Sequence, residues 1–175
     1  ASLVENFRGE LRSKCPGNEY ISDSEREELN ILKPSSSKYK DIIKNSNKKI
    51  NKFYTIYSYH KFIQLCEDKK IKLKNTLLVI DEVQNMVSES GTFYMNLKNV
   101  IDKSDSKTKI VLLSATPIFN NPVEIALTFN LLKPKKELPV GTEFTKMFLK
   151  PYKNKNDTFY EFINKDKFKK IIKGY

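Results

Sequence analysis

Two acidic residues at the end of an apolar run are the first candidates for chemistry in this sequence. Residues 76–80 are nearly continuously apolar, and Asp81 and Glu82 follow directly. Such a run is typical of a strand buried on both faces of a parallel sheet. Asp81 could bind Mg²⁺, which prefers oxygen ligands, and Glu82 could orient and deprotonate a water that attacks a terminal phosphate. The alternative is that this acidic pair only begins a polar loop.

A second apolar run further along the chain ends in hydroxyl-bearing residues. Residues 109–113 repeat the buried-strand pattern, and Ser114, Ala115 and Thr116 follow them. Ligands of open parallel sheets bind beyond the carboxyl ends of the strands. We therefore expect the two strand ends to contribute to one site, although Ser-Ala-Thr-Pro alone is equally compatible with a turn.

The elements that must position these residues alternate along the chain. Strands are predicted at 53–57, 76–80 and 109–113, because these runs are rich in β-branched, aromatic or aliphatic residues. Helices are predicted after Ser58, around residues 93–101, and from Asn121 until Pro134. This order predicts an α/β fold with a right-handed parallel sheet and flanking helices.

Segments outside this core are more polar. A helix is predicted at 3–14, where Leu3, Phe7 and Leu11 recur at helical spacing. Residues 18–52, lysine-rich from about 33, are predicted to be a partly mobile surface insertion. Two short helices are predicted after Pro151, the last one capped by Asp166.

The two strand ends together resemble a known pair of motifs. Residues 79–84 (VIDEVQ) and 112–117 (LLSATP) resemble motifs II and III of superfamily-two helicases and translocases, and residues 117–125 resemble the Swi/Snf-type continuation. The resemblance implies an incomplete RecA-like P-loop NTPase lobe that uses ATP and Mg²⁺. It assigns Mg²⁺ to Asp81 and water activation to Glu82. The remaining roles it implies are γ-phosphate sensing by Gln84 and coupling of hydrolysis to movement by Ser114, Ala115 and Thr116.

Weaker matches upstream concern the nucleic acid. Residues 2–10 resemble motif Ia and residues 56–59 resemble motif Ib, which implies that Ser2, Asn6, Ser58 and Tyr59 lie near a nucleic-acid backbone. The closest resemblance is to DNA-dependent ATPases and early transcription factors of large cytoplasmic DNA viruses. The Swi/Snf-like flank favours DNA over RNA as the partner. The resemblance also implies a second helicase lobe in cis and the transcription machinery as partners. A viral factory or virion is the implied location.

One motif of the family does not occur in these residues. None of the five glycines lies in a G-x-x-x-x-G-K-[ST] sequence, the loop that cradles phosphates. We therefore expect a fragment of a larger ATPase. In this interpretation residues 1–150 form a partial ATP-binding lobe, and residues 151–175 form a basic helical extension leading to a second lobe.

Composition narrows the classes of function without choosing among them. The 175 residues carry 32 basic and 21 acidic side chains, which gives a net charge of +11, and only three of the basic residues are arginine. Such a charge suggests a nucleic-acid partner. An AT-rich genome, which favours lysine codons, explains the lysine-rich composition equally well. The two cysteines cannot form a disulfide framework, which favours a reducing, intracellular compartment. No run is long enough to span a membrane, so no membrane partner is expected.

Two other classes remain open at this point. The chain could be a helicase-like lobe that binds nucleic acid or a partner without hydrolysis. It could also be a basic α/β binding domain in which the motifs occur by accident. The intact pair Asp81 and Glu82 argues against the first alternative, because a lobe without hydrolysis does not need both carboxylates.

Overall fold

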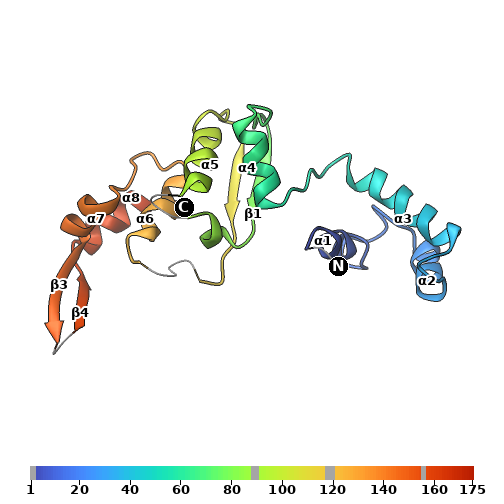
Figure 1. Ribbon diagram of the computed structural model, residues 1–175, viewed down its shortest axis with the longest axis horizontal. Coiled ribbons are helices and arrows are strands. Elements are labelled where there is room, and N and C mark those ends of the chain that lie inside the picture. Colours follow the sequence, from blue (N-terminus) through green and yellow to red (C-terminus); the bar gives the residue numbers. More distant parts are fainter. Residues whose placement is uncertain (1–2, 88–90, 117–120, 155–156) are drawn as a thin grey trace. The chain divides into compact units, whose positions relative to one another are not determined.

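The computed structural model divides the chain into two compact units, residues 1–58 and 59–175 (Figure 1). It describes residues 3–87, 91–116, 121–154 and 157–175. The second unit is an α/β structure with a small parallel sheet, as the order of elements predicts. In the described ranges no helix has the length and apolar character needed to span a membrane.

The first unit consists of three helices, α1 (Leu3–Leu11), α2 (Asp23–Ile31) and α3 (Ser37–Ile50). Residues 18–52, for which a partly mobile surface insertion was expected, thus contain two regular helices. Helix α2 begins with a capping box, in which the Glu25 N–H donates to Ser22 Oγ (3.3 Å) and the Ser22 N–H donates to Glu25 Oε2 (3.0 Å). Ile42 and Ile50 of α3 are buried. The capping box and this apolar stripe explain why a polar segment folds as helices.

Arginine side chains tie the first unit together. Arg26 donates to the carbonyl oxygens of Arg12 (2.9 Å) and Gly17 (2.8 Å), while Arg8 donates to Asn47 Oδ1 (2.8 Å) of α3. Arg12 also donates to Asn47 Oδ1. A guanidinium group offers five donors, so each arginine can satisfy several acceptors at once. All three arginines of the chain are thus used inside this unit.

Residues 53–57, predicted as a strand, have irregular backbone. A strand requires a hydrogen-bonded neighbour, and neither β1 nor β2 of the parallel sheet pairs with this segment. Its aromatic rings instead pack within the first unit. The Tyr54 ring lies 6.0 Å from both Phe7 and Tyr20, and the Phe53 ring lies 6.5 Å from Tyr20, in edge-to-face contacts.

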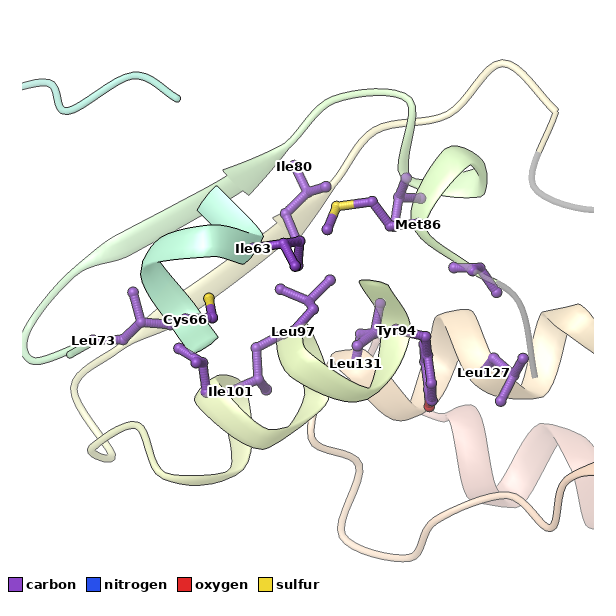
Figure 2. Close-up of a cluster of buried hydrophobic side chains, with 13 residues drawn as sticks. Ile63, Cys66, Leu73, Ile80, Met86, Tyr94, Leu97, Ile101, Leu127 and Leu131 are labelled. Carbon is purple, nitrogen blue, oxygen red and sulfur yellow. The ribbon is translucent and has the colours of Figure 1, made fainter. Parts of the chain in front are cut away.

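The parallel sheet of the second unit consists of β1 (Leu77–Ile80) and β2 (Lys109–Leu112), in register from Leu77 opposite Lys109 to Ile80 opposite Leu112. Helix α5 (Thr92–Asp102) connects the two strands, and α4 (Tyr59–Glu67) precedes β1. Figure 2 shows the buried cluster that these elements share, with Ile80 of β1 near side chains of α4 and α5. This packing orients the strands whose ends carry the candidate site.

The opposite face of this sheet is exposed, which corrects the expectation of strands buried on both faces. Leu77 is 62% exposed and Val79 is 51% exposed, while Val111 on β2 and Leu113 directly after it are 38% and 46% exposed. A sheet face is buried only where other elements cover it. Helices α4 and α5 pack with the alternate residues of both strands, such as Ile80 and Leu112.

A second cluster of buried hydrophobic side chains is formed by the residues that come after β2 in the sequence. It is built by α6 (Glu124–Leu131), α7 (Gly141–Phe148), the antiparallel pair β3 (Leu149–Asn154) and β4 (Asp157–Phe162), and α8 (Lys165–Ile172). Helix α6 contributes to both clusters, through Leu127 to the first and Ala126 to the second. The prediction of the first of two short helices after Pro151 is wrong, because the strands β3 and β4 occupy that position. The last helix is preceded by Asn164, and Asp166 lies inside its first turn.

Candidate functional site

The carboxyl ends of β1 and β2 lie side by side, as expected for parallel strands. The Leu113 N–H donates to the carbonyl oxygen of Ile80 (2.8 Å), and the Val83 N–H donates to the carbonyl oxygen of Leu113 (3.0 Å). These backbone bonds continue the pairing beyond the last residues of both strands. They fix the segments 81–84 and 113–116 against each other.

A chain of side-chain hydrogen bonds joins the two segments. Gln84, in the short 3₁₀ helix η1 (Val83–Met86), donates from Nε2 to Glu82 Oε2 (2.6 Å). Ser114 Oγ donates to Gln84 Oε1 (2.6 Å), and Ser114 Oγ also accepts from the Thr116 N–H (3.1 Å). A carboxylate at one strand end is thus connected to the backbone after the other strand. We call this arrangement the strand-end bridge.

The backbone at Glu82 is strained. Its φ of 53° and ψ of 48° lie in the left-handed region, which costs a residue with a Cβ about 1–2 kcal/mol. Such outliers concentrate at functional sites, where the surrounding structure compensates for the strain. Here the carbonyl oxygen of Glu82 accepts from the Tyr59 hydroxyl (3.0 Å), and the next residue, Val83, is buried.

Tyr59 therefore contacts the strand ends rather than only the nucleic-acid position that the resemblance implies. Its side chain is half-buried at the beginning of α4. Burial, followed by the nearby carboxylates of Asp81 and Glu82, raises the pKa of the Tyr59 hydroxyl. The hydroxyl accordingly remains a donor to Glu82 over the neutral range.

Asp81 and Glu82 are exposed, with oxygen donors suited to a hard cation. In the described residues, Asp81 and Glu82 belong to no group of three or more His, Cys, Asp or Glu that could hold a metal. Among the described residues, Asp81 and Glu82 are thus the acidic ligands offered at this edge of the sheet. This fits Mg²⁺, which retains waters and takes further oxygens from substrate phosphates. The residues do not supply a phosphate cradle, because no P-loop sequence is present among them.

The other predicted site residues are not brought together. Asn6 is exposed on α1, and Ser58 is exposed in the segment that ends the first unit. Ala115 is exposed between Ser114 and Thr116. Ser2 and residues 117–120, which carry part of the Swi/Snf-like flank, lie outside the described residues.

Two features of the second unit were not found by sequence reasoning. Asn130 is buried, and its amide accepts from the Leu138 N–H and donates to the Leu138 carbonyl oxygen, both at 2.9 Å. This pairing holds the turn after α6. That turn also carries Lys135 and Lys136, which line a groove together with lysines of α8. Neither residue type nor spacing in the sequence signals these contacts.

Ligands of open α/β sheets bind beyond the carboxyl ends of the strands, which is where Asp81, Glu82 and Ser114 lie. Comparison with known proteins points in the same direction. Over its whole length the chain is 51% identical in sequence to a putative ATP-dependent RNA helicase of Acanthamoeba polyphaga mimivirus, and the match covers 30% of that protein. A second protein of that virus with the same description is 30% identical over 67% of the chain, and the match covers 26% of that protein.

A third relative comes from another virus. Over 74% of the chain, the identity to a putative helicase of Invertebrate iridescent virus 3 is 27%, covering 13% of that protein. No family model and no solved structure matches the chain. The homologues are thus viral proteins named as helicases, and the chain spans less than a third of the length of each of these three.

Proposed function

We propose that the chain is part of an ATP-dependent nucleic-acid helicase or translocase, in which it forms much of the first RecA-like lobe. The strand-end bridge carries this proposal, because it links the Glu82 carboxylate after β1, through Gln84, to the Ser114 hydroxyl after β2. The names of the viral relatives support it independently. The Swi/Snf subtype, suggested by residues 117–125, belongs to the same proposal.

Each residue of the strand ends has a role in this proposal. Asp81 binds Mg²⁺ through its exposed carboxylate, and the ion stabilises negative charge on the phosphates when it is bound. Glu82 orients the attacking water and accepts its proton. The 2.6 Å hydrogen bond from Gln84 holds the Glu82 carboxylate at the strand end. Gln84 is also the γ-phosphate sensor in this proposal.

The bridge also suggests how hydrolysis is coupled to movement. A change at the Glu82 carboxylate alters the bond that Gln84 donates to it, and Gln84 is held by Ser114. Ser114 in turn accepts a hydrogen bond from the Thr116 N–H. We propose that Ser114, Ala115 and Thr116 transmit the state of the site to a second lobe.

The substrate is proposed as single-stranded or duplex nucleic acid. Four relatives from mimivirus carry "RNA helicase" in their names, which favours RNA. The Swi/Snf-like flank favours DNA and a part in viral transcription. Cys15 is exposed and Cys66 is buried, and both are free thiols, in keeping with the proposed reducing interior of an infected cell or virion.

Hydrolysis and strand displacement by the full-length protein test this proposal. We expect ATP hydrolysis that is stimulated by nucleic acid. RNA and DNA are tested separately, and the one that stimulates hydrolysis more strongly is identified as the substrate. Ser114→Ala should keep most of the hydrolysis and lose strand displacement. Ser104→Ala is the matched control, because its hydroxyl bonds Ile101 away from the strand ends. Absence of nucleic-acid-stimulated hydrolysis in the wild type would refute the proposal.

A further inference from the structure

A groove lined by lysines lies in the second unit, apart from the strand ends. It has a volume of about 580 Å³. The turn after α6 contributes Lys135 and Lys136, α8 contributes Lys167, Lys170 and Ile171, and Lys173, Gly174 and Tyr175 complete it. We call it the lysine groove. Two segments that are separated by α7 and the β3–β4 pair thus place five cations around one concavity.

The charge of these lysines is not compensated locally. In the described part of the chain none of the five forms a salt bridge, and all five are exposed. Glu137, next to Lys136, is instead bonded to Lys98 Nζ (2.6 Å), which also binds Asp102. Glu137 is therefore engaged elsewhere, and Asp166, one helical turn before Lys170 on α8, forms no salt bridge with the five lysines in the described residues. Like charges gathered in this way favour a polyanion.

An aromatic ring is held beside the lysines. The Tyr175 hydroxyl donates to the carbonyl oxygen of Lys133 (3.3 Å), and its N–H donates to the carbonyl oxygen of Ile172 (3.2 Å). Gly174 has a φ of 101°, which a residue with a side chain rarely adopts, and this turn brings Tyr175 back toward α8. The Tyr175 side chain remains 49% exposed. A fixed, half-exposed ring can stack on a base.

We infer that the lysine groove binds single-stranded nucleic acid, with phosphates at the lysines and a base on Tyr175. A positive groove with an aromatic platform is the arrangement by which proteins hold single strands without sequence preference. An acidic peptide could use the lysines but gains nothing from the ring. The inference rests on the proposed function for its choice of partner, and it assigns that partner to residues outside the helicase-like motifs.

The opposite side of α8 provides a matched control. Lys165 and Lys169 are also exposed on this helix but do not line the groove. The test variant is Lys167→Gln with Lys170→Gln, and the control is Lys165→Gln with Lys169→Gln. Both remove two charges from the same helix and shorten the side chains by the same amount. Circular dichroism checks that both variants fold like the wild type.

Fluorescence anisotropy of labelled oligo(U) and oligo(dT), with the 175-residue chain, measures the binding. Each phosphate that a lysine no longer neutralises reduces the salt slope of log K by about 0.7 on single strands. Removal of both groove lysines should therefore lower the salt slope by about 1.4. The ratio of wild-type to variant affinity should then be about 25 times larger at 0.1 M salt than at 1 M salt. The control variant should leave the slope near its wild-type value. Equal weakening in both variants, or unchanged binding by the groove variant, would overturn the inference.

The ring is tested separately. Tyr175→Ala should weaken binding about tenfold because the base no longer stacks on a ring, while Tyr175→Phe keeps the ring and most of the affinity. Equal weakening by both substitutions would refute the stacking role. Basal hydrolysis by the full-length protein, measured without nucleic acid, distinguishes the two proposals, because it depends on Glu82 and not on the groove. Intact nucleic-acid-stimulated hydrolysis with unchanged binding by the groove variants would reject the groove alone.

Discussion

The hydrogen bond between Gln84 and Ser114 can be tested by a double-mutant cycle. Both side chains are half-buried and uncharged, and Ser114 Oγ lies 2.6 Å from Gln84 Oε1. A neutral intramolecular hydrogen bond contributes about 1 kcal/mol to stability. We therefore expect a coupling energy of about 1 kcal/mol between Gln84→Ala and Ser114→Ala, which corresponds to about fivefold in an equilibrium constant. The bond to exposed Glu82 adds less, because solvent screens it.

Hydrogen exchange at the Val83 and Leu113 amides measures this coupling locally. These amides bond across the strand ends at 3.0 and 2.8 Å, so their protection reports the opening of the site itself. A local measurement is needed because the chain has two compact units and need not unfold in one step. The control pair is Asn96→Ala with Ser114→Ala, since Asn96 bonds Glu67 away from the site. A coupling no larger than that of the control pair would refute the bridge.

Three further outcomes follow from buried groups. Asn130→Ala should destabilise the second unit by about 2–4 kcal/mol in urea denaturation, because both backbone groups of buried Leu138 lose their partner; a loss below about 0.5 kcal/mol would contradict this. Burial raises the pKa of Cys66 to about 11, so at pH 8 iodoacetamide should label exposed Cys15 quickly and Cys66 only after unfolding, as mass spectrometry can show. The raised pKa of Tyr59 stabilises the fold below its ordinary value of 10.0, and this contribution is lost as pH rises through the raised value. Tyr59→Phe should therefore flatten the alkaline loss of stability.

The sequence predicts the parallel strands and the meeting of their ends well, because continuous apolar runs ending in polar residues are a strong signal. The runs at 76–80 and 109–113 contain β1 and β2, and residues 93–101 lie in α5. The exposed face of this sheet could not be predicted. Whether a strand is covered depends on elements distant in sequence, which a local pattern does not report.

The other wrong predictions of secondary structure also have physical causes. Ser22 and Glu25 form a capping box whose spacing is present in the sequence, but the polar composition of residues 18–52 obscured it. The β4 segment is rich in aromatic residues, a strand signal that the nearby lysines outweighed. Conversely, residues 53–57 have high strand propensity but no partner strand, so their rings pack against Phe7 and Tyr20.

The sequence predicts that the residues after β1 and β2 lie together, but not how their side chains are connected. Parallel strand ends must lie at one edge, so Glu82 and Ser114 were expected to be neighbours. The orientation of the Gln84 amide, which joins them, depends on the left-handed turn at Glu82 and on the η1 helix. The bond from Tyr59 to Glu82 likewise depends on where α4 packs. These are properties of tertiary packing.

Substitution of Glu82 by Gln in the full-length protein tests the central claim most directly. The glutamine keeps an acceptor oxygen for the bond from Gln84 but cannot accept the proton of the attacking water. General-base catalysis contributes about 10²–10⁴-fold, so hydrolysis should fall by at least about 100-fold while calorimetric binding of Mg·ATP is unchanged. Full hydrolysis by the Glu82→Gln protein would show that the base lies elsewhere and would contradict the account.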